Sequence, residues 1–390
     1  MSTPIDGSWR PETRLVRAGR ADGHEQGPVN PPIQRGSTVL LPSAASLYGP
    51  GKTYGLDGFA VHETLCDALA DLVGAAGALL TPSGLSACTV ALLACTRQGG
   101  EVLVTDSVYG PTRRFCDGLL ARFGVSTRYV DPRIGPAIAT MFTPHTQALF
   151  LESPGSLTME IQDVPALAAA ARRHGVTTII DDTWSAGLLF NPLDHGVDIS
   201  AQALTKYQAG HADVLMGALL TRDRARLASM RQTIKELGLG CGAPEDAYLA
   251  LRGLRTMPLR LARQGDSALT IARWLQSRAE VATVLHPALS SHPDHDMFRR
   301  DFAGAAGVFS IVLHPAPADR VAAMLDGLRL FGLGFSWGGY ESLIITCDEQ
   351  LTRTVAPTAT RGPLLRLSIG LEHPDDLIAD LADGFGRLAH

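Results

Sequence analysis

Lys206 is the residue of this sequence best suited to form a covalent bond with a cofactor. It follows the apolar run Ile199–Leu204 and stands in the tripeptide Thr205-Lys206-Tyr207. At the end of a predicted strand, partial burial would lower the lysine pKa, and the amine could then form an imine with an aldehyde. The hydroxyl of Thr205 could donate to a phosphate beside it. A solvated surface position, the ordinary fate of lysine, is the alternative.

Asp181 and Asp182 end another predicted strand, Thr177–Asp182. Strand-end carboxylates of a parallel sheet face the crevice in which ligands bind. A carboxylate opposite a pyridine nitrogen would keep that ring protonated, and the ring would then act as an electron sink. An exposed loop acid is the alternative for this pair.

Gly84 lies in the stretch Thr81–Ser86, between an apolar run and the helical pattern of residues 87–96. A glycine at the start of a helix leaves backbone N–H groups exposed, and together with the helix dipole these groups bind phosphate. A plain strand-to-helix turn fits the same residues. The sequence contains neither a G-x-G-x-x-G nor a Walker-type motif, which disfavours a dinucleotide or ATP as the ligand.

Tyr109 and Arg366 are the remaining candidates. Tyr109 follows a predicted strand and could stack on a flat cofactor ring, although a structural tyrosine in a turn fits equally well. Arg366 interrupts the apolar run 364–369. A buried arginine needs an anionic partner, and a substrate carboxylate held by two hydrogen bonds would provide one. An internal ion pair with Glu372 or Asp375 is the alternative.

The order of these candidates along the chain is itself informative. A phosphate loop comes first, then a stacking aromatic, a ring-nitrogen acid, an imine-forming lysine and a carboxylate-binding arginine. An enzyme that uses pyridoxal 5′-phosphate (PLP) in the aspartate aminotransferase fold type needs this set in this order. The sequence therefore predicts PLP as the cofactor, held on Lys206 as a Schiff base.

The surrounding pattern indicates how these residues would be brought together. Short apolar runs alternate with helical patterns, which predicts an α/β fold with a mostly parallel central sheet covered on both faces. We expect strands at residues 101–106, 125–130, 148–152, 177–182, 199–204 and 214–221, and helices at 111–123 and 165–174. Because ligands bind beyond the carboxyl ends of such strands, the candidates should meet there.

Three zones divide the chain. Residues 1–55, rich in Pro, Gly and Arg, are predicted to form an N-terminal arm that contacts a neighbouring subunit. Residues 56–250 are predicted to form the large PLP-binding domain, and residues 251–390 a smaller C-terminal α/β domain. In this last zone we expect helices at 254–279, 317–327 and 374–388, and strands at 307–313 and 364–369.

The composition is that of an ordinary globular chain. Of 390 residues, 45% are hydrophobic and 19% are charged, and the net charge of −5 argues against a nucleic-acid partner. Residues 1–20 lack the pattern of a secretory signal, and no run approaches the roughly 18 apolar residues of a membrane span. We therefore expect a cytoplasmic protein without a membrane partner. The six cysteines form no Cys-x-x-Cys pair, and no metal site is expected.

Four longer stretches give the chain a resemblance to a known family. They are Leu-Glu-Ser-Pro-Gly-Ser-Leu-Thr-Met-Glu at 151–160, Thr-Lys-Tyr at 205–207 with Gly210-His211, Ser-Trp-Gly-Gly-Tyr-Glu-Ser-Leu at 336–343 and Arg-Leu-Ser-Ile-Gly-Leu-Glu at 366–372. With these motifs the chain resembles the Cys/Met-metabolism (trans-sulfuration) family of PLP enzymes, from about Tyr54 to the C-terminus. The resemblance implies the type I fold of PLP-dependent transferases and a homotetramer built as a dimer of dimers.

The resemblance also implies a role for each candidate residue. Lys206 would hold the cofactor and shuttle protons, Asp181 would pair with the pyridine nitrogen, and Tyr109 would stack on the ring and help to deprotonate the incoming amine. The phosphate would be bound by Gly84, Leu85, Thr205 and, from a neighbouring subunit, Tyr54. Ser336 would support the lysine. The substrate would be bound by Arg366, Trp337, Ser336 and Tyr54.

Within the family, the chain resembles the β-lyase branch at Trp337, Ser156 and Leu157. Synthases and γ-lyases usually carry leucine in place of Trp337 and Asn-Pro in place of Ser156 and Leu157. The implied reaction is β-elimination of L-cystathionine, a sulfur amino acid, to L-homocysteine, pyruvate and ammonia in methionine biosynthesis. A C–S β-lyase for other cysteine S-conjugates, or a γ-acting relative, is the alternative. A non-catalytic PLP-binding regulator is a more remote one.

Four positions depart from the family pattern, and one of them is Ala203, which replaces a serine common in many relatives but is also tolerated in β-lyases. Leu56 replaces the arginine of a Tyr-x-Arg motif that normally binds the phosphate of the neighbouring subunit. Phe335 stands where the closest β-lyases often have tyrosine, and Asp182 stands where asparagine is usual. These departures concern the phosphate contacts and the exact thioether substrate rather than the class of reaction.

Overall fold

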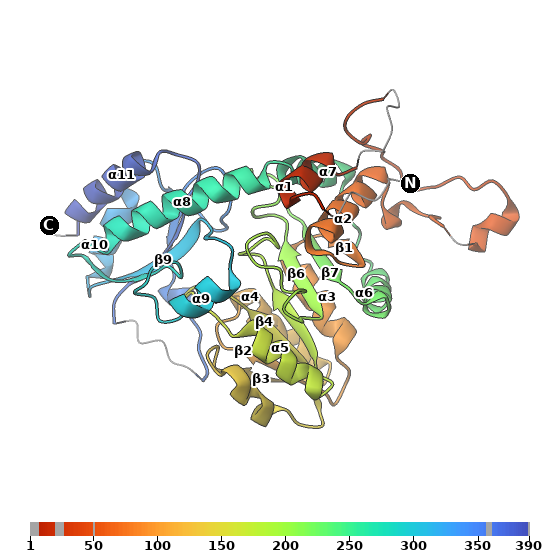
Figure 1. The fold of residues 1–390 in the computed structure, drawn as a ribbon, viewed down its shortest axis with the longest axis horizontal. Coiled ribbons are helices and arrows are strands. Elements are labelled where there is room, and N and C mark those ends of the chain that lie inside the picture. Colours follow the sequence, from red (N-terminus) through yellow and green to blue (C-terminus); the bar gives the residue numbers. More distant parts are fainter. Residues whose placement is uncertain (1–7, 20–26, 50, 356–360, 389–390) are drawn as a thin grey trace.

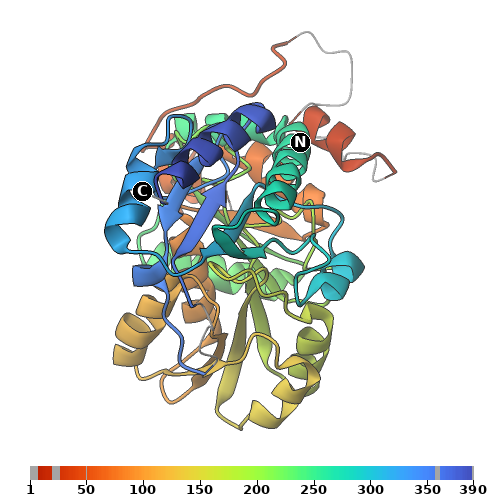
Figure 2. The ribbon, with the colours of Figure 1, turned by 90° about the vertical axis from the view of Figure 1, so that its left-hand side faces the viewer.

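The computed structural model describes residues 8–19, 27–49, 51–355 and 361–388, and within them the chain forms two separate β-sheets (Figure 1). The first sheet has seven strands and the second has five. Figure 2 shows the second sheet, in blue, above the yellow and green elements of the first. The predicted fold class, an α/β protein with a smaller C-terminal α/β unit, is confirmed.

The large sheet is mostly parallel. Only β7 runs against its neighbours, because it pairs antiparallel with both β1 and β6. The strands lie in the order β1-β7-β6-β5-β4-β2-β3, with the bounds β1 (Gly77–Thr81), β2 (Glu101–Thr105), β3 (Ser126–Val130), β4 (Thr146–Glu152), β5 (Thr177–Asp181), β6 (Ile199–Ala203) and β7 (Gly217–Thr221). Parallel strands need helical crossovers, and this requirement explains the strand–helix alternation read from the sequence.

Helices cover both faces of the large sheet. In β4 the side chains alternate, so that Leu149 and Leu151 enter one apolar core and Ala148 and Phe150 enter the other. The first core contains residues of α2 (Ala60–Val73), α5 (Val164–Arg173) and α7 (Pro244–Leu254), and the second contains residues of α3 (Gly84–Cys95) and α6 (Arg224–Glu236). Helix α4 (Gly110–Phe115) continues into a π-helical turn at Cys116–Leu120.

In the described part of the chain, helices pack on one face of the small sheet. Its order is β10-β11-β12-β9-β8, with the bounds β8 (Val281–Leu285), β9 (Val308–Leu313), β10 (Gly332–Leu333), β11 (Leu343–Thr346) and β12 (Leu364–Ser368). Residues of α8 (Met257–Leu275), α10 (Ala318–Asp326) and α11 (Pro374–Gly386) pack against it, and α9 (His295–Asp301) lies elsewhere. In β12, Leu365 and Leu367 face these helices, so Arg366 points to the opposite side.

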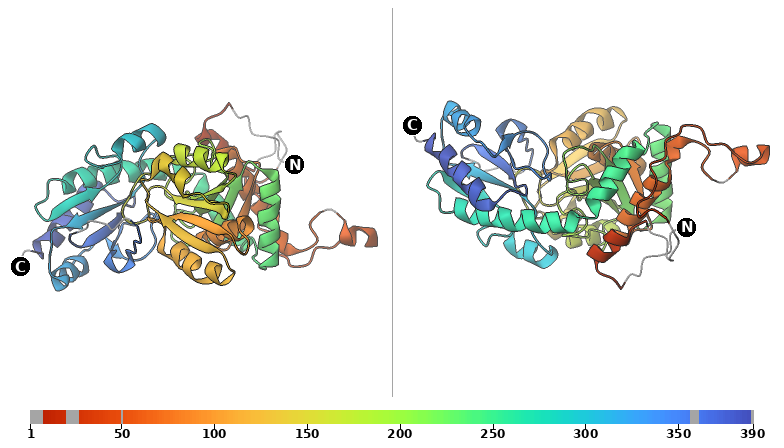
Figure 3. Two further views of the ribbon diagram at one scale, coloured as in Figure 1. Left: turned by 90° about the horizontal axis from the view of Figure 1, so that it is seen from below. Right: turned by 90° about the horizontal axis from the view of Figure 1, so that it is seen from above.

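The predicted helix at residues 254–279 is two helices in the structure. Helix α7 ends at Leu254, and α8 begins at Met257 and runs past the small sheet (Figure 3). Pro258 lacks a backbone N–H and would collide with the carbonyl of Leu254 in a continuous helix. The break therefore falls just before the proline, where proline is tolerated in the first turn of a new helix.

The N-terminal segment is only partly an extended arm. Residues 27–49 and 51–54, with a short 3₁₀ turn at Ala44–Tyr48, extend away from the two sheets, and a second 3₁₀ turn at Gly55–Asp57 leads back to α2 (Figures 1 and 3). Helix α1 (Pro11–Arg17), however, packs on α2 of its own chain through the buried side chain of Leu15. Single apolar residues in a polar helix are a weak sequence signal, which explains why this contact was not expected.

Leu15→Ala should destabilise the protein by about 2–4 kcal/mol, because it removes a fully buried side chain from the contact between α1 and α2. Val16→Ala, on the exposed side of the same helix, should change the free energy of unfolding by less than about 0.5 kcal/mol. Urea unfolding of the two variants checks this expectation. Equal stability of both variants would mean that α1 does not dock on the body.

Candidate active site

A cavity of about 240 Å³ lies at the carboxyl ends of the large-sheet strands. Residues of the small sheet and its loops close the other side. The cavity lining includes every predicted site residue except Tyr54, namely Gly84, Leu85, Tyr109, Asp181, Thr205, Lys206, Ser336, Trp337 and Arg366. Tyr54 is 55% exposed on the projecting segment and does not line the cavity of its own chain.

The start of α3 is fixed by a close backbone approach. Ser83 caps the helix by accepting a hydrogen bond from the N–H of Ser86 at 3.1 Å. A Cβ atom on Gly84 would lie only 2.3 Å from the Cβ of Ala203, so only glycine fits between α3 and the end of β6. The N–H groups of Gly84 and Leu85 are in the first helical turn, where they have no acceptor within the helix. This turn can therefore receive an anion.

Lys206 is largely buried in the turn that directly follows β6. Its Nζ donates a hydrogen bond to Oγ of Ser336 at 2.6 Å and lies 5.1 Å from the ring centre of Trp337. Burial, and then the cation of Arg366, lower the pKa of Lys206 to about 8 against the opposing effect of Asp181. A lysine with this pKa has far more free amine at neutral pH than an exposed one, as a nucleophile requires.

Ser336 and Arg366 support each other. Ser336 has a φ of 80°, a left-handed conformation that costs a non-glycine residue free energy unless its surroundings hold it. Its backbone carbonyl accepts a hydrogen bond from Nη2 of Arg366 at 3.1 Å. The same arginine that faces the cavity therefore also holds the serine that contacts Lys206.

Arg366 has no acidic partner in the described part of the chain. The ion pair considered from the sequence is absent among these residues, because Glu372 accepts two hydrogen bonds from Ser342 and Asp375 is largely exposed. Burial lowers the pKa of Arg366. A buried, unpaired guanidinium in a cavity is a ready site for a carboxylate.

Asp181 ends β5 opposite Glu152 at the end of β4. Asp181 accepts hydrogen bonds from the N–H and hydroxyl of Thr183 at 3.0 and 2.5 Å. Burial raises the pKa of Asp181, while Thr183, Cys88 and Lys206 act against this rise. The carboxylate therefore lies in a pocket where a cationic ring would be a favourable neighbour.

Glu152 is a cavity residue that the sequence analysis missed. Its carboxyl accepts a hydrogen bond from the backbone N–H of Tyr109 at 2.6 Å. Burial, and then the charge of Asp181, raise its pKa well above the ordinary value. Glu152 ends the predicted strand 148–152, just as Asp181 stands at the end of its own predicted strand. This position is the sequence signal that could have identified it.

Tyr109 and Thr205 lie in the cavity wall with different surroundings. Tyr109 is partly exposed, and burial followed by the charge of Glu152 raises its pKa. The Thr205 hydroxyl donates to the carbonyl of Met216 at 3.2 Å and accepts from its N–H at 3.0 Å. The Thr205 hydroxyl is thus hydrogen-bonded to the backbone of Met216, directly before β7, on one side of the cavity.

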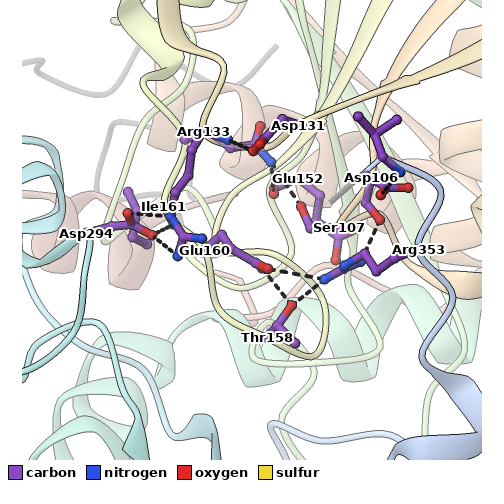
Figure 4. Close-up of polar contacts among 12 residues, drawn as sticks. Asp106, Ser107, Asp131, Arg133, Glu152, Thr158, Glu160, Ile161, Asp294 and Arg353 are labelled. Atoms are coloured by element: carbon purple, nitrogen blue, oxygen red, sulfur yellow. Dashed lines mark hydrogen bonds and ion pairs between the residues drawn. The ribbon is translucent and has the colours of Figure 1, made fainter. Parts of the chain in front are cut away.

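The segment of residues 153–162 forms part of the cavity wall and is held from both sides (Figure 4). Glu160 pairs with Arg353 at 3.3 Å. Asp294 accepts two hydrogen bonds from Arg133 at 2.8 Å each and one from the N–H of Ile161 at 3.0 Å. These contacts join the large-sheet loops to loops of the C-terminal part of the chain.

The departures from the family pattern at residues 56, 182 and 335 lie in different places. Phe335 lines the cavity and is 77% exposed at its opening, whereas Asp182 is completely buried behind the cavity. Leu56 lies outside this cavity. Among the described residues there is no group of three or more His, Cys, Asp and Glu side chains that could hold a metal. No described helix has the length and apolarity to cross a membrane.

Comparisons with known proteins agree with this arrangement. Residues 12–386 match a family profile described as Cys/Met metabolism PLP-dependent enzyme. Cystathionine beta-lyase MetC of Escherichia coli is 40% identical over 390 residues, covering 97% of this chain and 98% of that protein. Cystathionine beta-lyase of Haemophilus influenzae is 39% identical with the same coverage. The solved structure of cystathionine gamma synthase from Xanthomonas oryzae pv. oryzae is 32% identical with a TM-score of 0.89, covering 99% of both chains.

Arg366→Gln should raise the pKa of Lys206 above about 8 in the cofactor-free protein, because a cation that disfavours the ammonium form is removed. The pH dependence of Lys206 reductive methylation, followed by mass spectrometry, measures this pKa. Arg353→Gln is the matched control, since Arg353 is also buried but pairs with Glu160. An unchanged Lys206 pKa in Arg366→Gln would contradict the electrostatic coupling.

Proposed function

Because the chain belongs to the family of Cys/Met-metabolism PLP-dependent enzymes, we propose that it catalyses β-elimination of L-cystathionine to L-homocysteine, pyruvate and ammonia. The observation that carries the proposal is the buried amine of Lys206, 2.6 Å from Ser336 and beside the unpaired Arg366. This arrangement supports a reaction of a small amino acid. The identities with two cystathionine beta-lyases support the choice of this amino acid.

The residues of the cavity fit PLP. Lys206 has a lowered pKa and suits the aldehyde, Asp181 suits the ring nitrogen, and the first turn of α3 at Gly84 and Leu85 suits the phosphate. When bound, PLP supplies an electron sink that stabilises negative charge at the substrate Cα. We propose that Tyr109 covers the ring and that Thr205 adds a contact to the phosphate.

Substrate orientation follows from the charges in the cavity. Arg366 would bind the α-carboxylate, because it is the guanidinium of the cavity lining and has no acidic partner in the described residues. Trp337 and Ser336 lie beside Lys206 and would bound the space for the substrate Cα and Cβ. The apolar ring of Phe335 at the opening would contact the far part of the thioether.

Proton transfer is assigned to Lys206. With a pKa of about 8, a fraction of about a tenth of its amine is free at neutral pH, against less than about a thousandth for an ordinary lysine. The free Nζ would take the proton from the substrate Cα and return a proton to the sulfur as the Cβ–S bond breaks. Ser336, in contact with Nζ, would hold the amine between these two positions.

Two alternative functions differ from the proposed reaction, one in its substrate and the other in the bond that is broken. A C–S β-lyase for other cysteine S-conjugates is favoured by the exposed apolar Phe335, which needs no charged group on the substrate. A γ-acting relative is represented by the synthase from Xanthomonas oryzae, which is less identical to this chain than the two β-lyases are. A PLP-binding regulator without turnover would need the imine-forming lysine but would have no need of the unpaired Arg366 as a site for a substrate carboxylate.

We also propose that the protein is a homotetramer, a dimer of dimers, in which the projecting segment reaches a neighbouring subunit. Leu40 and Tyr48 are 93% and 98% exposed on this segment, and such apolar exposure is unfavourable for an isolated chain. Tyr54 lies outside the cavity of its own chain but on the same segment, so it could complete the phosphate site of a neighbour.

Lys206→Ala should abolish turnover and the visible absorbance of the bound cofactor, whereas Lys235→Ala, an exposed control, should retain both. With L-cystathionine, the native enzyme should release pyruvate and homocysteine, because the Cβ–S bond breaks. A coupled lactate dehydrogenase assay and chromatography identify the products. Release of 2-oxobutyrate would mean γ-elimination, and full activity of Lys206→Ala would refute the assignment.

Mixing inactive Lys206→Ala subunits with inactive Tyr54→Ala subunits should restore about a quarter of the native activity, because each mixed dimer would contain one intact shared site. The mixture is refolded or co-expressed, and activity is compared with each parent alone. No recovery, with mixed dimers present by mass spectrometry, would contradict sharing of the site across subunits.

A further inference from the structure

A buried chain of hydrogen bonds connects the segment after Lys206 with the segment after Asp181. Nε2 of Gln208 donates to Oε1 of Gln202 at 2.8 Å, and Nε2 of Gln202 donates to Oδ2 of Asp182 at 3.3 Å. The other Asp182 oxygen contacts Oγ of Ser185, which also lies 2.9 Å from the carbonyl oxygen of Phe190. All four polar side chains are fully or almost fully buried.

The charge of Asp182 depends on how many protons its hydrogen bonds with Ser185 require. Ser185 carries one hydroxyl proton but lies between two oxygens, the carboxyl of Asp182 and the carbonyl of Phe190. The carbonyl of Phe190 can only accept, and the one hydroxyl proton of Ser185 is free to satisfy it when Asp182 supplies the proton of the other contact. The contact between Ser185 and Asp182 then needs a second proton, and Asp182 is the group that can carry it.

The surroundings of Asp182 offer an ionised carboxylate only the hydrogen bonds of neutral groups, and these are outweighed by burial and by Asp181. No lysine, arginine or histidine pairs with it in the described part of the chain. The charged group that acts on it is Asp181, a neighbouring acid, and the groups of Ser185, Gln202 and Gly187 that face it are neutral. Burial, and then Asp181, raise the pKa of Asp182 well above its ordinary value. A buried, unpaired charge would be costly here.

We propose that Asp182 is a neutral carboxylic acid that donates its proton to Ser185 and acts as a positioning residue for the cavity. Through Gln202 and Gln208 it links the end of β5 to the turn that follows Lys206. Because Asp182 is uncharged, it does not repel negative charge on Asp181, so the neighbouring acid can remain ionised. In this protein, a protonated acid thus replaces the asparagine expected from the family pattern as a neutral hydrogen-bonding group.

The protonation state can be measured without substrate. In the infrared spectrum of the PLP-loaded protein at neutral pH, Asp182→Asn should remove a protonated-carboxyl C=O band, which shifts on ¹³C labelling of aspartate. Asp198→Asn is the matched control, because Asp198 lies just before β6 and pairs with Arg226 at 3.3 Å, and this substitution should leave the protonated-carboxyl band in place. If Asp182→Asn instead removes intensity from the ionised-carboxylate bands, the proposal is wrong.

Thermal unfolding across pH provides a second test. A carboxyl whose pKa is raised on folding must bind a proton when the chain folds, so its contribution to stability falls as pH rises above the ordinary value. The melting temperature of Asp182→Asn should therefore exceed that of the native protein by a margin that grows from about pH 5 to about pH 8. Asp182→Ala, which cannot donate to Ser185, should melt below Asp182→Asn at both pH values.

A margin that stays constant or shrinks with rising pH would overturn the proposal. Both measurements are independent of turnover. A failure of the cystathionine assay would therefore leave them unchanged, and a failure here would not bear on the reaction assigned to Lys206.

Discussion

Two cations share one cavity without an acid paired to Arg366 in the described residues, and the rest of the site depends on this imbalance. Burial of Lys206 and the field of Arg366 both favour the free amine of the lysine. The same lack of a partner leaves Arg366 available to a carboxylate. One electrostatic arrangement thus prepares a nucleophile or base and an anion site together, and hydrogen bonds to Ser336 hold both side chains in place.

The two sheets supply the two cations separately. In the large sheet, β6 ends shortly before Lys206. The close approach of Gly84 to Ala203 places the start of α3 at the same edge of the sheet. The small sheet contributes Arg366 because the alternation of β12 turns it away from α8, α10 and α11. The site therefore exists only where a helix-free face of the small sheet meets the strand ends of the large one.

Strand ends were predictable from the sequence because apolar runs stop abruptly at polar residues, as at Asp181 and before Lys206. Family motifs added Ser336 and Trp337, which no local pattern would have placed opposite Lys206. The docking of α1, the acid Glu152 and the proton chain through Asp182 were not predicted. Each depends on contacts between residues distant in sequence, and single side chains such as Leu15 leave no periodic signal.

The contact between Lys206 and Ser336 joins residues that are 130 positions apart in the chain. During synthesis, the large sheet can form while the small sheet has not yet left the ribosome. Lys206 at that stage lacks both Ser336 and Arg366, so neither the hydrogen bond to its amine nor the neighbouring cation is present. The order of synthesis therefore delays the full reactivity of Lys206 toward an aldehyde until the small sheet has folded against the large one.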